Sequence, residues 1–181
     1  MHKKGAIVAE IIITAKEAAE AMDVLASQER ELRYEQRFGA TETLELGIAA
    51  ARLAPEFGET YTVTITREED GAIAFQWLGE GKGARNLEFA AGKRTAALVS
   101  GHASPWTQLQ AIASDKPLDE VWAHVPEVCP ACGAFPIRVR DEWVATIAVS
   151  GLHEGLDHEV IVRVLEQVLG TTVPRFAVTV A

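Results

Sequence analysis

The segment from residue 60 to residue 78 constrains the fold most, because it has the pattern of two strands joined by a turn. On either side of the turn, apolar side chains alternate with threonine or with other small or polar residues: Tyr61, Val63, Ile65, then Ile73, Phe75, Trp77. The intervening residues 68–71 read Glu-Glu-Asp-Gly, which is typical of a turn. We therefore predict an antiparallel hairpin with one face buried in a core.

The same alternation predicts a second hairpin between residues 135 and 149. Apolar residues alternate before Asp141-Glu142, at Phe135, Ile137 and Val139, and a second apolar segment follows it: Val144, Ala145, Ile147, Val149. A shorter alternation at 32–37 suggests one more strand. We expect these segments to form an antiparallel sheet.

Helical spacing of apolar residues predicts four helices, over 15–31, 41–53, 86–100 and 157–170. Pro55 ends the second, Gly101 ends the third, and Asp157 has the character of an N-cap rather than of a catalyst. Residues 102–128 are expected to be irregular apart from a short helix near 118–124. The chain is thus predicted to be a single α+β domain in which an antiparallel sheet carries helices on its face.

The ends of the chain have a different character from the centre. Residues 1–15 are interpreted as an N-terminal extension whose β-branched residues suit a strand. Residues 16–170 form the predicted globular domain, and residues 171–181 form a tail suited to an edge strand. Glu10 interrupts the first apolar run and no cleavage site follows it, so we expect a cytoplasmic protein rather than a secreted one.

The charge balance limits the classes of partner. The chain of 181 residues carries a formal net charge of −9, and its basic residues are not clustered. An acidic surface repels phosphate backbones, so we expect no nucleic-acid partner. The longest apolar stretch is too short to cross a bilayer, so no membrane partner is expected either.

Cys129 and Cys132 have the spacing of a redox pair or of half a zinc site. The chain has no second cysteine pair, so completing a zinc site would need histidines brought in by the fold. We interpret the two as loop thiols without a metal. A redox pair and a haem-ligating thiolate remain open alternatives.

Histidines and basic residues supply the other candidate groups. His102, His153 and His158 each suit a haem ligand or an acid–base group, and each equally suits a surface or capping position. Lys93-Arg94 and the pair Arg138 and Arg140 suit carboxylate binding, or simply a solvated face. Ser150-Gly151, between a predicted strand and a predicted helix, offers free backbone N–H groups for an anion, which a tight turn would also explain.

Several of these segments together resemble the haem-degrading-domain family, which includes HbpS-like, GlcG-like and PduO C-terminal-like proteins. The resemblance rests on the run 133–139, on Ser150-Gly151-Leu152 and on residues 157–160. Within the family the chain is similar to a branch of small bacterial and fungal proteins, through residues 44–47, Asn86 with Lys93-Arg94, and residues 101–104. The resemblance to the family extends over roughly residues 25 to 170.

The resemblance implies a profilin-like layer fold, homo-oligomers and haem as the cofactor. Transferred to this chain, it points to Asn86, Lys93, Ser150 and Gly151 as cofactor-binding residues, with Lys93 as the contact for a propionate. His102 is our candidate iron ligand. The resemblance assigns no catalytic residue. This chain departs from the family by having Cys132 where a glycine is usual, which places a thiol beside the expected pocket.

Three hypotheses follow. The first is a haem- or tetrapyrrole-binding protein that assists haem degradation. The second is a cofactor-free oligomeric adaptor or assembly protein without catalytic activity, in which the same motifs build only the fold and the subunit interface. The third is a small-molecule enzyme, which requires Ser150, Lys93 and His158 to lie around one pocket.

Overall fold

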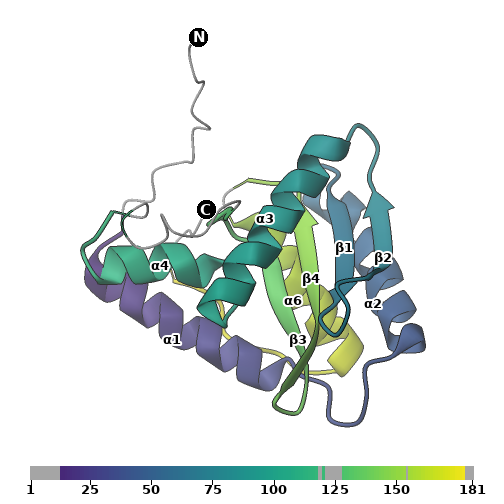
Figure 1. Ribbon diagram of the computed structural model, residues 1–181, viewed down its shortest axis with the longest axis horizontal. Helices are drawn as coiled ribbons and strands as arrows, with labels where there is room; N and C mark the ends of the chain where they lie inside the picture. The colour runs from purple at the N-terminus through teal and green to yellow at the C-terminus, as the bar shows by residue number, and fades with distance from the viewer. Residues whose placement is uncertain (1–12, 118–119, 121–127, 154, 178–181) are drawn as a thin grey trace.

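The structure is a computed structural model that describes residues 13–117, 120, 128–153 and 155–177. A four-stranded antiparallel sheet with helices packed against it forms a single α+β domain (Figure 1). The strands lie in the order β2-β1-β4-β3 and have the bounds β1 Thr62–Arg67, β2 Ile73–Leu78, β3 Ala134–Val139 and β4 Glu142–Ser150. Both predicted hairpins and the predicted fold class are confirmed.

The register of the two central strands decides which side chains enter the core. Val63 of β1 pairs with Trp77 of β2 on one side and with Val149 of β4 on the other. Ile65 pairs in the same way with Phe75 and Ile147. Because side chains alternate between the faces of a strand, these apolar residues share one face of the sheet, and the threonines of β1 share the other.

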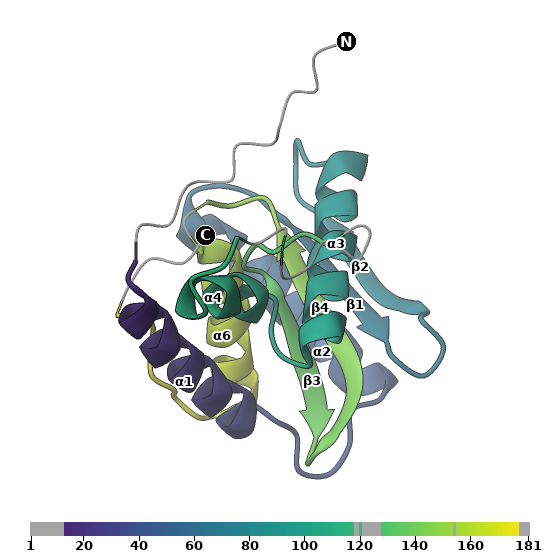
Figure 2. The same cartoon turned by 60° about the vertical axis from the view of Figure 1, so that its left-hand side comes forward.

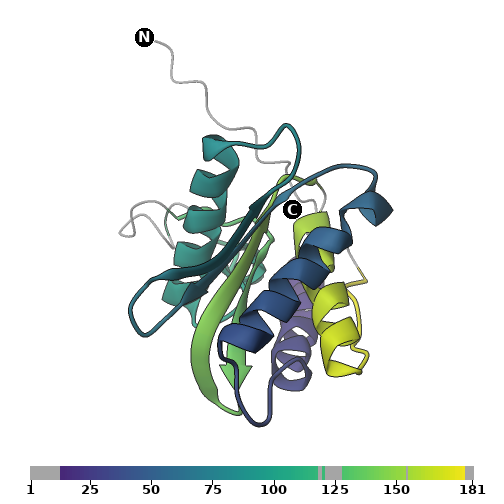
Figure 3. The same ribbon diagram turned by 90° about the vertical axis from the view of Figure 1, so that its right-hand side faces the viewer.

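Five α-helices and one short 3-10 helix are described. They are α1 Ala15–Glu31, α2 Ala40–Arg52, η1 Ala54–Phe57, α3 Ala84–Ser100, α4 Pro105–Ala113 and α6 Leu156–Leu169. α2 and α6 pack on the apolar face of the sheet, and α3 packs on the opposite face (Figure 3). α1 lies alongside α4, at the β3 side of the molecule (Figure 2).

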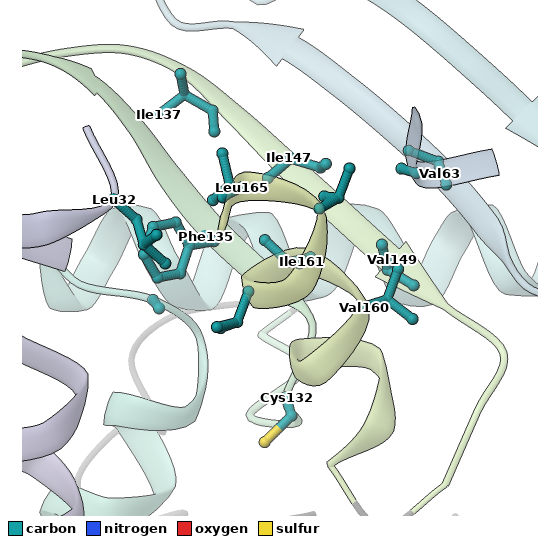
Figure 4. Packing of buried hydrophobic residues seen from close by; sticks show 14 of the residues in the cluster. Leu32, Val63, Cys132, Phe135, Ile137, Ile147, Val149, Val160, Ile161 and Leu165 are labelled. Atoms are coloured by element: carbon teal, nitrogen blue, oxygen red, sulfur yellow. The ribbon is translucent and has the colours of Figure 1, made fainter. Parts of the chain in front are cut away.

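The main core lies between the sheet and α6. Phe135, Ile147 and Val149 from the strands are fully buried against Ile161 and Leu165 from the helix (Figure 4). Burial of this many large apolar side chains is the main favourable contribution to the folding free energy.

The other face of the sheet is covered because its residues are small. Ala134 of β3 and Ala148 of β4 form a small buried cluster with Ala90 and Ala97 of α3. Alanine side chains allow a helix to approach the sheet closely. The helices therefore cover both faces of the sheet.

Several local predictions differ from the structure. The strand predicted at 32–37 is wrong, because only Tyr34 forms an isolated bridge, with Val139. Helix α4 lies in the segment predicted to be irregular; Pro105 begins this helix, and in the first turn its missing N–H costs nothing. The N-cap of α6 is Gly155 rather than Asp157, which lies inside the first turn.

Some predictions concern residues that the structure does not describe. Residues 1–12 of the N-terminal extension and almost all of the helix predicted near 118–124 lie outside the described residues, whereas Ile13 and Thr14 are described and form no strand, since Thr14 is the N-cap of α1. Residues 171–177 of the tail are described and contain no strand, and the remainder of the predicted edge strand lies outside. Among the described residues, no helix has both the length and the apolar character needed to span a membrane.

Candidate histidine site and buried ion pair

His102 is held at the surface by a carboxylate from a different helix. It directly follows Gly101, the left-handed C-cap of α3. Its Nδ1 lies 2.9 Å from Oε2 of Glu29, which belongs to α1. The second oxygen of Glu29, Oε1, accepts a hydrogen bond of 2.6 Å from the backbone N–H of Ala103. One buried carboxylate therefore fixes both the imidazole ring and the backbone beside it.

An aromatic contact fixes the plane of the same ring. Trp106, in the first turn of α4, stacks on His102 with ring centroids 3.6 Å apart and an interplanar angle of 14°. The His102 side chain is 33% exposed, and its Nε2 forms no hydrogen bond with the described part of the chain. Because a carboxylate only accepts hydrogen bonds, the contact favours the neutral tautomer that has its proton on Nδ1 and its lone pair on Nε2.

The surface around His102 combines apolar and cationic groups. Leu98 and Val99, in the last turn of α3, are 41% and 38% exposed. The guanidinium of Arg138 donates a hydrogen bond of 3.3 Å to the carbonyl of Gly101. A positive charge thus lies beside Gly101, and two exposed aliphatic side chains lie within four residues of His102 in the chain.

Lys93 lies elsewhere, inside the protein. Its ammonium donates to Oδ2 of Asp157 at 2.6 Å and to the carbonyl oxygen of Val149 at 3.0 Å. The two charged side chains are only 5% and 6% exposed. Lys93 thus joins α3 to the end of β4 and the start of α6, and it could bind a propionate only by giving up this pair.

The loop before β3 closes over this ion pair. Gly133 has φ +121, and a Cβ placed on it would lie 2.5 Å from the carbonyl oxygen of Val149 and 3.0 Å from Nζ of Lys93. Oδ1 of Asp157 accepts a further hydrogen bond of 3.0 Å from Leu152 N–H. Burial raises the pKa of Asp157, while the charge of Lys93 opposes that increase.

Asn86, Ser150 and Gly151 build turns and strand ends. Oδ1 of Asn86 accepts from Gly83 N–H at 3.3 Å and caps α3. Ser150 is buried in β4, and the carbonyl of Gly151 accepts from Nζ of Lys82 at 3.0 Å. The helix between Asn86 and Ser100 is about 20 Å long at 1.5 Å per residue. Within one chain, Asn86 and His102 therefore lie at opposite ends of α3.

His158 is buried in the core beside α1. Its Nε2 lies 2.8 Å from Oε1 of Gln28, and its ring stacks on Phe176 of the tail with centroids 5.4 Å apart. Burial, helped by the charge of Arg175, lowers its pKa to about 3. It is therefore neutral at physiological pH.

The hypothesis of a small-molecule enzyme requires Ser150, Lys93 and His158 to lie around one pocket. All three side chains are buried, and none lines any of three clefts of about 920, 450 and 750 Å³. His102 lines none of these clefts either. The cleft of about 920 Å³ lies between the start of α2, the β1–β2 turn and Trp143.

The two cysteines differ in environment. Cys129 is partly exposed, and its N–H donates to the carbonyl of Gly92 at 3.0 Å. Cys132 is buried, and burial raises the pKa of its thiol to about 12, which keeps it protonated. Among the described residues, no three His, Cys, Asp or Glu side chains form a group that could hold a metal ion.

Sequence reasoning selected His102 but missed its two partners. Glu29 lies four residues after Leu25, on the stripe of α1 that the apolar residues bury. A charged residue at a core-facing position needs a partner. The position of Glu29 among the buried residues of α1 is therefore the sequence feature that indicates a partner. Trp106 was missed because α4 was not predicted.

Comparison with known proteins shows which family this chain resembles. The profile of the family described as haem-degrading protein HbpS-like matches residues 38–166. The chain belongs to the HbpS-like family. The resemblance inferred from the sequence motifs is thereby confirmed, and a haem-related function is supported at the level of the family.

Solved structures show the same fold for this HbpS-like chain. The structure of the Ybr137w protein matches with a TM-score of 0.70 and 21% identity, over 84% of this chain and 87% of that one. HbpS matches with a TM-score of 0.58 and 23% identity, over 77% and 95%. A PduOC–haem complex matches with a TM-score of 0.61 and 16% identity, over 71% and 92%.

Proposed function

We propose that this HbpS-like protein binds haem or a related tetrapyrrole with Nε2 of His102 as the axial ligand. The observation that carries the proposal is the contact of Nδ1 with Glu29, which leaves Nε2 as the free lone pair at the surface. Family membership supports it, as does the relative of the same fold that was crystallised with haem.

The residues around His102 suit the remaining parts of a porphyrin. Leu98 and Val99 offer an aliphatic surface for the macrocycle, because their side chains are exposed and lie within four residues of His102 in the chain. Arg138 offers the positive charge of a guanidinium for a propionate carboxylate, and its two terminal nitrogens also donate to the carbonyls of Asp141 and Gly101. Bound haem would supply the iron redox chemistry that breakdown requires.

The experiment is a haemin titration of the purified protein, followed by its visible spectrum. The wild type is expected to give a saturable, shifted Soret band, and the His102→Ala variant is expected to lose most of it. His153→Ala is the matched control, because His153 is an exposed histidine whose side chain forms no ring contact or ion pair with the residues that the structure describes. Haem breakdown is then followed as loss of the Soret band when a reductant and oxygen are supplied.

The results separate the hypotheses. Equal weakening by His102→Ala and His153→Ala would indicate nonspecific capture by surface imidazoles and would refute the proposed ligand. A wild-type spectrum identical to free haemin would refute haem binding and favour the adaptor hypothesis.

We also propose that the protein acts as a cytoplasmic homo-oligomer. Exposed apolar side chains on α2 and β2 support this part, since isolated copies would leave them in water: Leu44, Ile48, Ile73, Leu78. Light scattering during size-exclusion chromatography measures the mass. A mass of one chain at all concentrations would refute the oligomer.

A further inference from the structure

We infer that Glu29 is the positioning residue of the His102 site: its carboxylate fixes the Nδ1–H tautomer and makes Nε2 a more basic ligand. The inference concerns the same site as the proposed function and rests on it for the effect on haem. The tautomer itself is a property of the protein alone.

The two oxygens of Glu29 have separate tasks. Oε2 faces the His102 ring at 2.9 Å, and Oε1 accepts the Ala103 N–H at 2.6 Å. A carboxylate that already binds a backbone donor cannot turn away from the ring without losing that bond. Glu29 is also buried, so water does not compete for its oxygens.

Stacking makes the restraint complete. The indole of Trp106 lies 3.6 Å from the imidazole centroid and nearly parallel to it. The backbone of Trp106 is fixed to the same segment, since its backbone N–H donates to the carbonyl of Ala103 at 3.0 Å. The ring plane and the direction of Nε2 are therefore fixed before any ligand arrives.

A carboxylate bonded to Nδ1–H draws that proton away from the ring. The imidazole then has more electron density at Nε2 and stabilises the more oxidised state of a metal bound there. Loss of such a partner typically weakens metal binding about 10- to 100-fold. The structure thus predicts that Glu29 affects both the affinity and the reduction potential of a bound haem.

The first test uses the protein without haem. Nitrogen-15 NMR of the His102 ring at about pH 9, where imidazole is neutral, is expected to show a proton on Nδ1 in the wild type. Glu29→Ala is expected to shift the proton toward Nε2. Glu31→Gln is the control, because Glu31 is exposed on the same helix and pairs with Arg30 rather than with His102. A wild type protonated at Nε2, or an unchanged tautomer in a folded Glu29→Ala variant, would overturn the inference.

The second test uses haemin and redox titration. Glu29→Ala is expected to bind about 10- to 100-fold more weakly and to have a higher reduction potential. Glu29→Gln, which keeps an accepting oxygen without the charge, is expected to recover most of the affinity but not the low potential. Circular dichroism checks that each variant is folded.

The two tests fail in different ways. If the wild type binds no haem, the proposed function is refuted while the tautomer measurement still decides the role of Glu29. If His102→Ala abolishes binding but neither Glu29 variant changes the potential, haem binding stands and the inferred role of Glu29 is refuted.

Discussion

Replacing Lys93 with methionine tests how much the buried ion pair between Lys93 and Asp157 contributes to the stability of the fold. Nζ of Lys93 lies 2.6 Å from Oδ2 of Asp157 and 3.0 Å from the carbonyl oxygen of Val149. Methionine keeps the length of the stem but removes the charge and both hydrogen bonds. Removing one partner of a buried pair typically costs about 3–5 kcal/mol, a large part of a typical domain stability of about 5–15 kcal/mol.

The loss should depend on pH in a defined direction. Burial already raises the pKa of Asp157, and the positive charge of Lys93 opposes that increase. Without Lys93, the pKa of Asp157 in the folded protein rises further. At a pH above the ordinary pKa of aspartate, Asp157 is then still protonated in the folded variant but already ionised in the unfolded chain. The variant therefore loses stability as pH rises, and its deficit should be larger at pH 8 than at pH 5.

Urea unfolding, followed by tryptophan fluorescence, gives the free energies of a double-mutant cycle. The variants are Lys93→Met, Asp157→Leu and the combination, whose cost should be below the sum of the single costs by about 0.5–3 kcal/mol. Lys16→Met is the control, because Lys16 and its partner Glu20 are 85% and 61% exposed; it should cost less than about 0.5 kcal/mol. A cost below about 1 kcal/mol for Lys93→Met, or strict additivity in the cycle, would refute the reasoning.

Two further outcomes are expected from the core. The lowered pKa of His158, about 3, means that the unfolded chain binds a proton that the folded chain does not. Wild-type stability should fall by up to about 1.4 kcal/mol per pH unit below about pH 6, and His158→Gln should have a shallower slope in urea unfolding; equal slopes would contradict the assignment. Gly133→Ala should destabilise far more than Gly58→Ala in thermal melts, because the first Cβ would lie 2.5 Å from a carbonyl oxygen and the second would have open space; similar losses would mean that backbone angle alone matters.

The fold was largely predictable because its elements follow local patterns. The hairpin of β1 and β2 and the stripe of α6 are periodic, so the sequence alone identifies the strands and the buried face. α4 was not predictable in this way, since it begins at a proline and is only nine residues long. The packing of α3 on the second face of the sheet was also not predictable from a local pattern, because alanine and threonine residues are not clear indicators of burial.

The candidate site was only partly predictable for a different reason. His102 could be selected as an imidazole after a helix end, but its carboxylate partner is 73 residues earlier in the chain. Such a contact depends on how α1 and α4 pack, and no local pattern contains it. Lys93 was selected as a propionate contact, and its burial against Asp157 depends equally on tertiary packing.

The position of Glu29 has a practical consequence for how this protein is compared and shortened. The family profile begins at residue 38, so the carboxylate that holds His102 lies outside the region by which the family is recognised. A chain trimmed to the matched region would keep the imidazole and lose its anchor together with all of α1. Two family members can therefore agree throughout the matched region and still differ in how firmly they hold this histidine, and a survey of relatives has to extend to the preceding helix.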